Sequence, residues 1–228
     1  MIVKESVMMH DVKVCMDHDE VSVDIDVPFS VDGVVETHSV TIDDIIRQKL
    51  PQAIDRVHIA APYHMLETGH NLLDTDVPKF DAIYWADNDS AHENGWILLP
   101  EDFLRLSVFE MSDWACPVYE LITPADPRYQ LQYSRYKGIR GTADQPVCVL
   151  GVRPEGRVLE FYSCRSKKVT VTRGVYIPKA EKDNDGGYDV SPLCYDAMVS
   201  MAAGMTLLTI GERERANAMF EEAKSFLQ

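Results

Sequence analysis

The sequence lacks the signatures by which common catalytic and metal-binding proteins are recognised. It contains no phosphate-binding loop of the G-x-x-x-x-G-K-[ST] or G-x-G-x-x-G type and no G-x-S-x-G nucleophile elbow. The cysteines, at positions 15, 116, 148, 164 and 194, are odd in number and form no C-x-x-C pair, which argues against a zinc finger and a disulfide framework. We expect reduced, mostly buried thiols, no cofactor and no enzymatic activity.

Long apolar runs and an export signal are also missing. The longest uninterrupted apolar stretch is only a few residues, and Met1–Ser6 lacks the apolar region of a secretory signal. We expect a soluble protein that is made in the cytoplasm and has no membrane partner. A chain of 228 residues with 46% apolar content can build one substantial core or two small ones, and one domain with an insertion is the simplest prediction.

Positive charge is scarce, and the net charge of −15 argues against sequence-independent wrapping of duplex DNA. The charge is also unevenly distributed. Residues 1–44 hold eleven Asp and Glu against two Lys and Arg (net −9), whereas residues 128–179 hold three against eleven (net +8). Identical copies could join acidic face to basic face, head to tail. The alternative is that both regions are solvated faces of one monomer.

The N-terminal third of the chain predicts helices around an acidic strand. Residues 5–19 have near-helical apolar spacing and favour a helix, although residues 12–14 also alternate like a strand. Residues 20–40 alternate as a strand that runs into a turn at Asp32-Gly33. An amphipathic helix follows Thr41, its expected N-cap, and Pro51 predicts a kink or two successive helices. The apolar stripe of this helix contains Ile42, Ile45, Ile46, Leu50, Ala53, Ile54 and Val57.

The C-terminal residues predict an αα-hairpin. Ser191 and Pro192 are the expected N-cap and first residue of a helix that ends at Gly211, and a second helix is expected over residues 215–227. The expected buried stripes are Leu193, Ala197, Met201, Met205 and Leu208 in the first helix, and Ala216, Met219, Phe220, Ala223 and Phe226 in the second. Small residues at 202–204 would let a neighbouring helix approach closely.

Short β-prone runs fill the middle of the chain, at residues 96–99, 104–109, 118–122, 147–152, 158–162 and 169–171. Residues 154–156 read as a hairpin turn, and residues 184–187 as a flexible joint. We therefore expect an α+β fold: a discontinuous helical bundle, made of the N-terminal helices and the C-terminal αα-hairpin, with an inserted antiparallel β module. The expected divisions are residues 1–71, 72–187 and 188–228.

Few residues suggest chemistry. His58, His64 and His70 are more simply a chance cluster than a metal site. Residues 87–93 begin like a calcium loop but lack the glycine and the final glutamate, and residues 183–186 offer too few ligands, so ordinary acidic turns are expected. Cys116 has no nearby oxyanion glycines, and we interpret it as a buried strand cysteine rather than a nucleophile.

Tyrosines and cations interleave between residues 128 and 141. Such a segment could stack single-stranded bases, or it could anchor a protein partner, because Tyr and Arg are enriched at interface hot spots. The overall acidity favours a protein interface or plain loop packing. The candidate interface residues in this segment are Tyr133, Arg135, Tyr136, Lys137 and Arg140.

Several segments resemble the head-to-tail adaptor, or ring, proteins of crAss-like short-tailed bacteriophages. These segments are residues 41–46, 60–62, 95–106 (GWILLPEDFLRL), 111–114, 136–141 and 145–148. The resemblance spans about residues 40–228, and the acidic region before it departs from the family's pattern.

The resemblance implies a virion structural protein that forms a ring, expected to be twelvefold, in the neck below the portal. Its partners would be copies of itself, the portal protein and other neck or tail rings, and genomic double-stranded DNA would pass non-specifically through the lumen. It also implies that Phe103 is buried at a junction, that Arg105 faces a neighbour and that Trp114 lies near a contact. The alternatives are another neck or tail ring of the same particle, a small binding module or a hydrolase.

Overall fold

The structure is a computed structural model that describes residues 1–16, 25–31, 34–66, 69–72, 83–86, 93–134 and 136–228. It contains α-helices and antiparallel sheets, which confirms the predicted α+β class. The chain divides into a helical unit, Met1–Thr68 with Lys179–Gln228, and a β unit, Gly69–Pro178. The helical unit is discontinuous in sequence. The divisions fall after residues 68 and 178, compared with expected divisions after residues 71 and 187.

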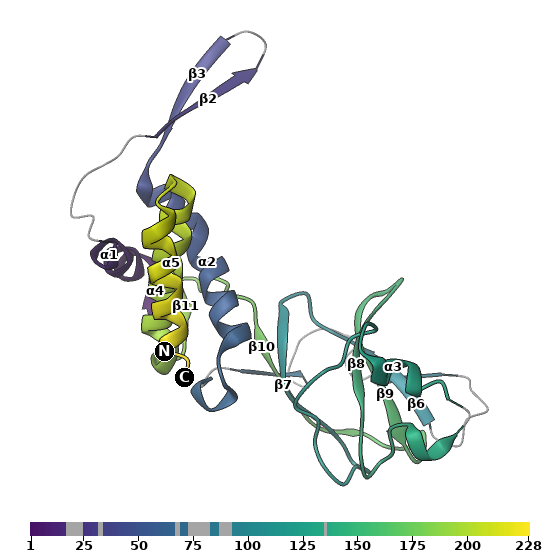
Figure 1. Ribbon diagram of the computed structural model, residues 1–228. Coiled ribbons are helices and arrows are strands. Elements are labelled where there is room, and N and C mark those ends of the chain that lie inside the picture. The colour runs from purple at the N-terminus through teal and green to yellow at the C-terminus, as the bar shows by residue number, and fades with distance from the viewer. Residues whose placement is uncertain (17–24, 32–33, 67–68, 73–82, 87–92, 135) are drawn as a thin grey trace. The chain divides into compact units, whose positions relative to one another are not determined.

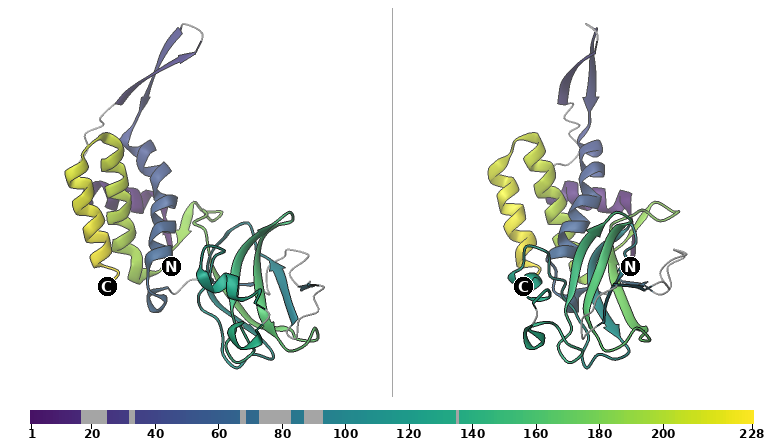
Figure 2. Two further views of the ribbon diagram at one scale, coloured as in Figure 1. Left: turned by 45° about the vertical axis from the view of Figure 1, so that its right-hand side comes forward. Right: turned by 90° about the vertical axis from the view of Figure 1, so that its right-hand side faces the viewer.

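The helical unit is built around one central helix, α4. Its elements are β1 (Ile2–Lys4), α1 (Glu5–Cys15), β2 (Ile25–Val31), β3 (Val34–Val40), α2 (Ile42–Ala60), η1 (Tyr63–Met65), β11 (Gly187–Asp189), η4 (Pro192–Cys194), α4 (Tyr195–Ile210) and α5 (Arg213–Ser225). Helix α4 packs against α1, α2 and α5, and α4 and α5 run side by side in opposite directions (Figures 1 and 2). The predicted αα-hairpin is therefore present.

Helix α4 is buried on nearly every side because it is apolar on nearly every side. The residues from Ala197 to Ser200 and from Ala202 to Leu207 are all buried. The prediction of a single buried stripe was wrong, since Leu193 and Leu208 are exposed. By length and composition Pro192–Ile210 would also suffice to cross a membrane, but 61% of this apolar stretch is buried inside the protein, as in a core helix.

Helix α2 follows its sequence signals closely. Every residue of its predicted stripe is buried, and the Thr41 hydroxyl accepts a hydrogen bond from the Asp44 amide in a capping box. Pro51 lies inside the helix, which continues from Ile42 to Ala60, so the alternative of two successive helices was wrong.

Of three further helix signals, two are confirmed and one is wrong. Gly211 ends α4 with a φ of 95°, as predicted for a C-cap glycine. A Cβ atom on Gly204 would lie 2.7 Å from the Phe220 ring, so the expected close helix approach is present. Ser191 does not cap α4: its hydroxyl donates to the carbonyl oxygen of Met65 at 2.5 Å.

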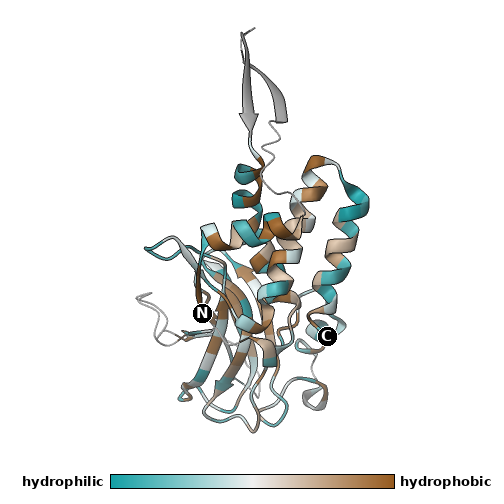
Figure 3. Ribbon diagram, turned by 90° about the vertical axis from the view of Figure 1, so that its left-hand side faces the viewer, coloured by the Kyte–Doolittle hydropathy of each residue, from teal (hydrophilic) through white to brown (hydrophobic). Residues whose placement is uncertain are grey.

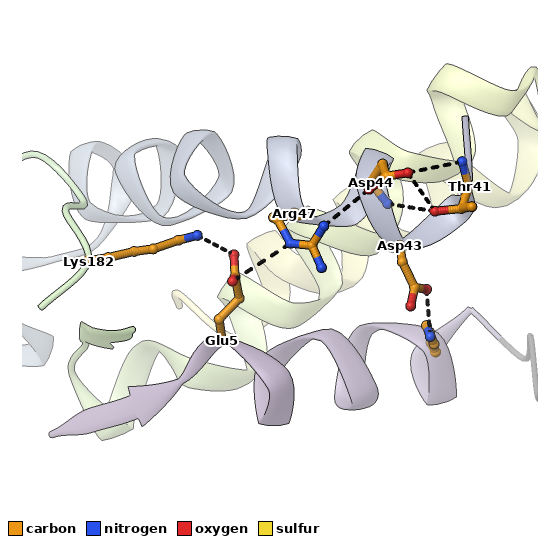
Figure 4. A network of polar contacts seen from close by, with 7 residues as sticks. Glu5, Thr41, Asp43, Asp44, Arg47 and Lys182 are labelled. Atoms are coloured by element: carbon orange, nitrogen blue, oxygen red, sulfur yellow. Dashed lines mark hydrogen bonds and ion pairs between the residues drawn. The ribbon is translucent and has the colours of Figure 1, made fainter. Parts of the chain in front are cut away.

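A polar network links both ends of α1 to the first turns of α2 (Figure 4). The Glu5 carboxylate pairs with Lys182 at 2.8 Å and with Arg47 at 3.8 Å, and Asp43 pairs with Lys13 at 2.5 Å. Part of the N-terminal acidic charge is therefore neutralised inside the helical unit.

Two strand pairs of the helical unit were only partly foreseen. Strands β2 and β3 form an antiparallel sheet of their own, with Val31 opposite Val34. The predicted turn at Asp32-Gly33 lies outside the described residues. Strand β11 pairs with β1, and the residues expected to form a flexible joint, 184–187, include a tight turn at Gly186, which has a φ of 75°.

In its described residues, the β unit contains two antiparallel sheets. Its elements are β4 (His70–Asn71), β5 (Tyr84–Trp85), β6 (Glu93–Leu98), β7 (Phe103–Met111), α3 (Pro127–Leu131), η3 (Lys137–Ile139), β8 (Cys148–Arg153), β9 (Gly156–Cys164) and β10 (Val171–Pro178). The strand orders are β5-β6-β9-β8 and β4-β10-β7. The predicted hairpin turn is present at Gly156, with a φ of 136°, whereas residues 118–122 make only isolated bridges.

Strand β9 is the most deeply buried strand of the β unit. Leu159 and Phe161 lie in the main core, while Tyr162 on the other side packs in a small cluster with Val149 and Ile122. Figure 3 shows hydrophobic residues along the strands of this unit. Because β9 is covered on both sides, polar groups on it need partners within the protein.

Candidate interaction surface

One face of the four-stranded sheet carries a row of aromatic and charged side chains. Tyr84 pairs with Trp96 across β5 and β6, and Trp96 pairs with Glu160 across β6 and β9, so the three share a face. The Tyr84 and Trp96 rings stack with centroids 5.7 Å apart and planes 11° apart. The Arg153 guanidinium carbon lies 3.7 Å from the centroid of the Trp96 ring, in a cation–π contact.

Glu160 is the buried polar centre of this row, with only 8% of its surface exposed. Its carboxylate pairs with Arg153 at 2.8 Å and accepts a hydrogen bond from the Tyr162 hydroxyl at 2.6 Å. A buried carboxylate is costly unless a cation and hydrogen-bond donors satisfy it, and both are present here.

A chain of tyrosine hydroxyls leads from Glu160 to the surface. The hydroxyls of Tyr162 and Tyr133 are 3.2 Å apart, and those of Tyr133 and Tyr129 are 2.8 Å apart. The hydrogen bond to Tyr133 raises the pKa of Tyr129 to about 12, and burial raises the pKa of Tyr162 further. The hydroxyls of Tyr129 and Tyr162 therefore remain protonated and act as hydrogen-bonding groups.

The backbone of residues 127–141 is held by a buried glutamine that sequence patterns did not indicate. Gln132 is 6% exposed; its side-chain oxygen accepts from the Gly141 amide at 2.8 Å, and its side-chain nitrogen donates to the Arg128 carbonyl at 3.0 Å. A Cβ atom on Gly141 would lie 2.6 Å from the Ser163 hydroxyl oxygen, so this approach requires glycine. The segment is thus an anchored loop.

This anchored loop presents large apolar side chains to solvent. The exposed fractions are 41% for Leu131, 60% for Tyr133, 63% for Tyr136 and 48% for Ile139. We refer to these four residues as the aromatic patch. Exposed apolar residues that lie close together in the sequence, in a segment held by hydrogen bonds, favour a protein-binding surface.

Of the interface residues predicted in the segment 133–140, two are exposed, one is half-buried, and two have side chains outside the described residues. Tyr133 and Tyr136 belong to the aromatic patch. Arg140 is half-buried, and its Nε donates to the carbonyl oxygen of Ser134, so it holds the loop rather than presenting a free charge. Arg135 and the side chain of Lys137 lie outside the described residues.

Three predicted interface residues lie elsewhere in the β unit, and two of them are interior. Phe103 is 1% exposed and stacks on Tyr176 in the core of the β unit, and Trp114 is 7% exposed and packs edge-on against Phe109. The side chains of Phe103 and Trp114 are therefore part of the core and cannot contact a partner at the surface. Arg105 is half-buried on β7.

The candidate metal positions are ordinary turns where they are described. Within the described residues no group of three or more His, Cys, Asp or Glu is placed to hold a metal ion. The Asp183 carboxylate accepts hydrogen bonds from the backbone amides of Asp185 and Gly187, at 3.0 and 2.6 Å. Residues 87–92 lie outside the described residues.

The thiols are mostly buried, but Cys116 is not. Cys148, Cys164 and Cys194 are buried, and burial raises their pKa values, that of Cys164 to about 12. Cys116 is exposed, which contradicts its interpretation as a buried strand cysteine, because the chain bends there after β7. Its sulfur lies 3.7 Å from the Asp144 carbonyl oxygen.

Comparison with known proteins adds no assignment: no protein-family model and no curated protein matches the chain. The function is therefore inferred from the surface described above and from the segments that resemble the adaptor family.

Proposed function

We propose that this chain is a virion structural protein, a head-to-tail connector that forms a ring below the portal, joins capsid to tail and surrounds part of the DNA channel. One observation carries the proposal. A helical unit discontinuous in sequence holds an inserted β unit, which is the organisation that the resemblance implies for adaptors.

Residues 95–106, which resemble the adaptor family, include the connection between β6 and β7, and hydrogen bonds hold this connection in place. The Arg157 side chain donates to the carbonyl oxygen of Phe103. The Tyr176 hydroxyl donates to the Asp102 carboxylate at 2.9 Å. A connection held in this way suits a protein whose role is to hold other proteins in a defined geometry.

The aromatic patch supports a binding role. Tyr133 and Tyr136 offer large ring surfaces with few rotatable bonds, so their immobilisation on binding costs little conformational entropy. Anchoring through Tyr162 and Gln132 reduces this cost further. A connector needs such surfaces for several neighbours at once.

The net charge of −15 suits a DNA channel. Lysine and arginine bind the phosphate backbone, so a basic lumen would retain the genome. An acidic wall repels phosphates and lets the duplex slide.

The test is co-assembly with the portal protein encoded in the same genome. The two proteins are expressed together, and the complex is imaged by electron cryomicroscopy. We expect a ring of this chain on the tail-facing end of the portal. A chain that stays monomeric beside intact portals, or that has enzymatic turnover as a monomer, contradicts the proposal. A reconstruction of whole virions separates the adaptor from another neck or tail ring.

A further inference from the structure

We propose that Tyr129 and Tyr133 form an oxidative modification site, at which a one-electron oxidant of the haem peroxidase class, supplied with hydrogen peroxide, joins the two phenol rings as dityrosine. The two residues lie four positions apart, in the loop that carries the aromatic patch. This chemistry is a property of the β unit itself and does not depend on the connector function.

The two phenol groups meet at their hydroxyl ends. Their oxygens are 2.8 Å apart, the ring centroids are 5.3 Å apart, and the ring planes are at 79° to each other. Phenoxyl radicals couple through the ring carbons next to the carbon that bears the oxygen, and these carbons lie at the hydroxyl end of each ring. The reactive edges are therefore held near each other, which makes the coupling an intramolecular reaction with a short approach.

The backbone around both tyrosines is fixed. Tyr129 lies on α3, whose N-cap, Asp126, accepts a hydrogen bond from the Arg128 amide. Gln132, next to Tyr133, donates to the Arg128 carbonyl at 3.0 Å and accepts from the Gly141 amide. Because the loop is anchored on both sides of the pair, the two rings keep their mutual position until they react.

Tyr133 is the phenol that an oxidant reaches first. It is 60% exposed, whereas Tyr129 beside it is half-buried. A phenol loses an electron more easily when a hydrogen-bonded group accepts its proton. The hydroxyl of Tyr133 is bonded to that of Tyr162, which in turn donates to the Glu160 carboxylate at 2.6 Å. The proton released from Tyr133 thus has an acceptor beside it.

The reaction balances with the two phenols and one peroxide. Each ring loses one electron and one proton. One carbon–carbon bond forms between the rings, and one ring carbon–hydrogen bond is broken on each of them. The two electrons and two protons reduce one hydrogen peroxide, through the haem of the oxidant, to two water molecules.

Tyr162 is the nearest competitor for Tyr133. Their ring centroids are 6.0 Å apart, but Tyr162 is only 8% exposed and its ring packs in a cluster with Val149 and Ile122. A ring enclosed in this way cannot turn to bring its coupling carbon against Tyr133. The expected product therefore joins Tyr133 to Tyr129.

The experiment treats the dilute full-length chain, after alkylation of the exposed thiol of Cys116, with a haem peroxidase and limiting hydrogen peroxide. Trypsin then cleaves after Arg128 and Arg135, so the peptide 129–135 contains both tyrosines of the pair and no other tyrosine. Mass spectrometry should find this peptide lighter by two hydrogen atoms. We expect at least about tenfold more of this product than of dityrosine at any other pair.

The peptide positions separate the outcomes. Dityrosine that mainly joins the peptide 129–135 to the peptide of Tyr136, to that of Tyr162, or to a second copy of itself overturns the proposal. A chain that consumes peroxide without forming dityrosine overturns it as well.

Substitution and unfolding provide a second readout. Tyr129→Phe keeps the ring and leaves the bond between Tyr133 and Tyr162 in place, and it should abolish the product. Tyr119→Phe, which changes a 50% exposed tyrosine outside the loop, is the matched control and should keep the full yield. In denaturant the yield of the original chain should fall by about tenfold, because the rings lose their fixed approach. An equal yield in the folded and unfolded chain would assign the coupling to sequence proximity alone and overturn the site.

Discussion

The hydroxyl oxygens of Tyr133 and Tyr162 lie 3.2 Å apart, and this hydrogen bond joins the exposed patch to the interior of the β unit. Tyr162 donates its only hydroxyl proton to Glu160. Tyr133 must therefore donate to Tyr162, and Tyr129 to Tyr133. The buried Glu160 carboxylate thus fixes the donor and acceptor in each of these hydrogen bonds. Loss of one hydroxyl therefore disturbs the whole series.

Tyr162→Phe tests this chain directly. The substitution keeps the ring but removes the donor to Glu160 and the acceptor for Tyr133, so we expect the free energy of unfolding to fall by about 1–3 kcal/mol. Amide hydrogen exchange in residues 129–140 should become faster. Tyr119→Phe is the control on an exposed tyrosine. Unchanged stability and unchanged exchange in Tyr162→Phe would mean that the hydroxyl chain does not hold the loop.

Gly204→Ala tests the close approach of α4 and α5. The new Cβ atom would lie 2.7 Å from the Phe220 ring and 3.2 Å from the Ala216 carbonyl oxygen, so the helices must separate or the ring must move. We expect a loss of about 1–3 kcal/mol of stability, measured by denaturant unfolding. Gly138→Ala is the matched control, since nothing lies within 4 Å of its Cβ position. Equal stability of the two variants would contradict the packing described here.

His58 predicts a loss of stability in mild acid. The residue is 3% exposed, and burial lowers its pKa below the ordinary value near 6.5, although the charges of Asp55 and Asp189 oppose the shift. As the pH falls below about 6.5, His58 therefore binds a proton more readily in the unfolded chain than in the folded chain. The stabilising effect of neutral His58 is fully present above about pH 6.5 and is lost as the pH falls through the folded pKa.

The measurement is the free energy of unfolding between pH 8 and pH 5. We expect His58→Leu to be less sensitive to pH than the original chain, by at most about 1.4 kcal/mol per pH unit. His10→Gln, on the exposed side of α1, should keep the original sensitivity. If both variants behave alike, the acid sensitivity comes from another group.

Thr41→Ala tests the capping box at the junction of β3 and α2. The threonine hydroxyl accepts from the Asp44 amide at 3.2 Å and donates to the Asp44 carboxylate at 2.7 Å. We expect a loss of about 1 kcal/mol, measured by thermal unfolding, and recovery of most of it in Thr41→Ser, which keeps the cap. A Thr41→Ser variant as unstable as Thr41→Ala would assign the effect to the methyl group instead.

Local signals in the sequence predicted local structure well. The stripe of α2, the cap at Thr41, the helix end at Gly211 and the turn at Gly156 are each set by residues within a few positions of one another. The predicted set of buried residues in α4 was wrong because a helix that is apolar on all sides has no periodic hydrophobic pattern.

The candidate surface was predictable only in part. The interleaved tyrosines indicated the right segment, but Gln132 carries no distinguishing pattern, and its role depends on Gly141 folding back against it. Trp114 was expected at a contact, yet its packing on Phe109 is a property of the folded sheet. Strand β1 pairs with β11, which lies far from it in the sequence, and no local pattern encodes such a pairing.

The most direct test of the proposed connector function is electron cryomicroscopy of the chain mixed with the portal protein encoded in the same genome, at a resolution that traces the backbone. The account predicts a closed ring of this chain on the tail-facing end of the portal, with an acidic lumen wide enough for duplex DNA. Portals that carry no density for this chain at saturating concentration, or virions in which it lies away from the neck, would contradict it.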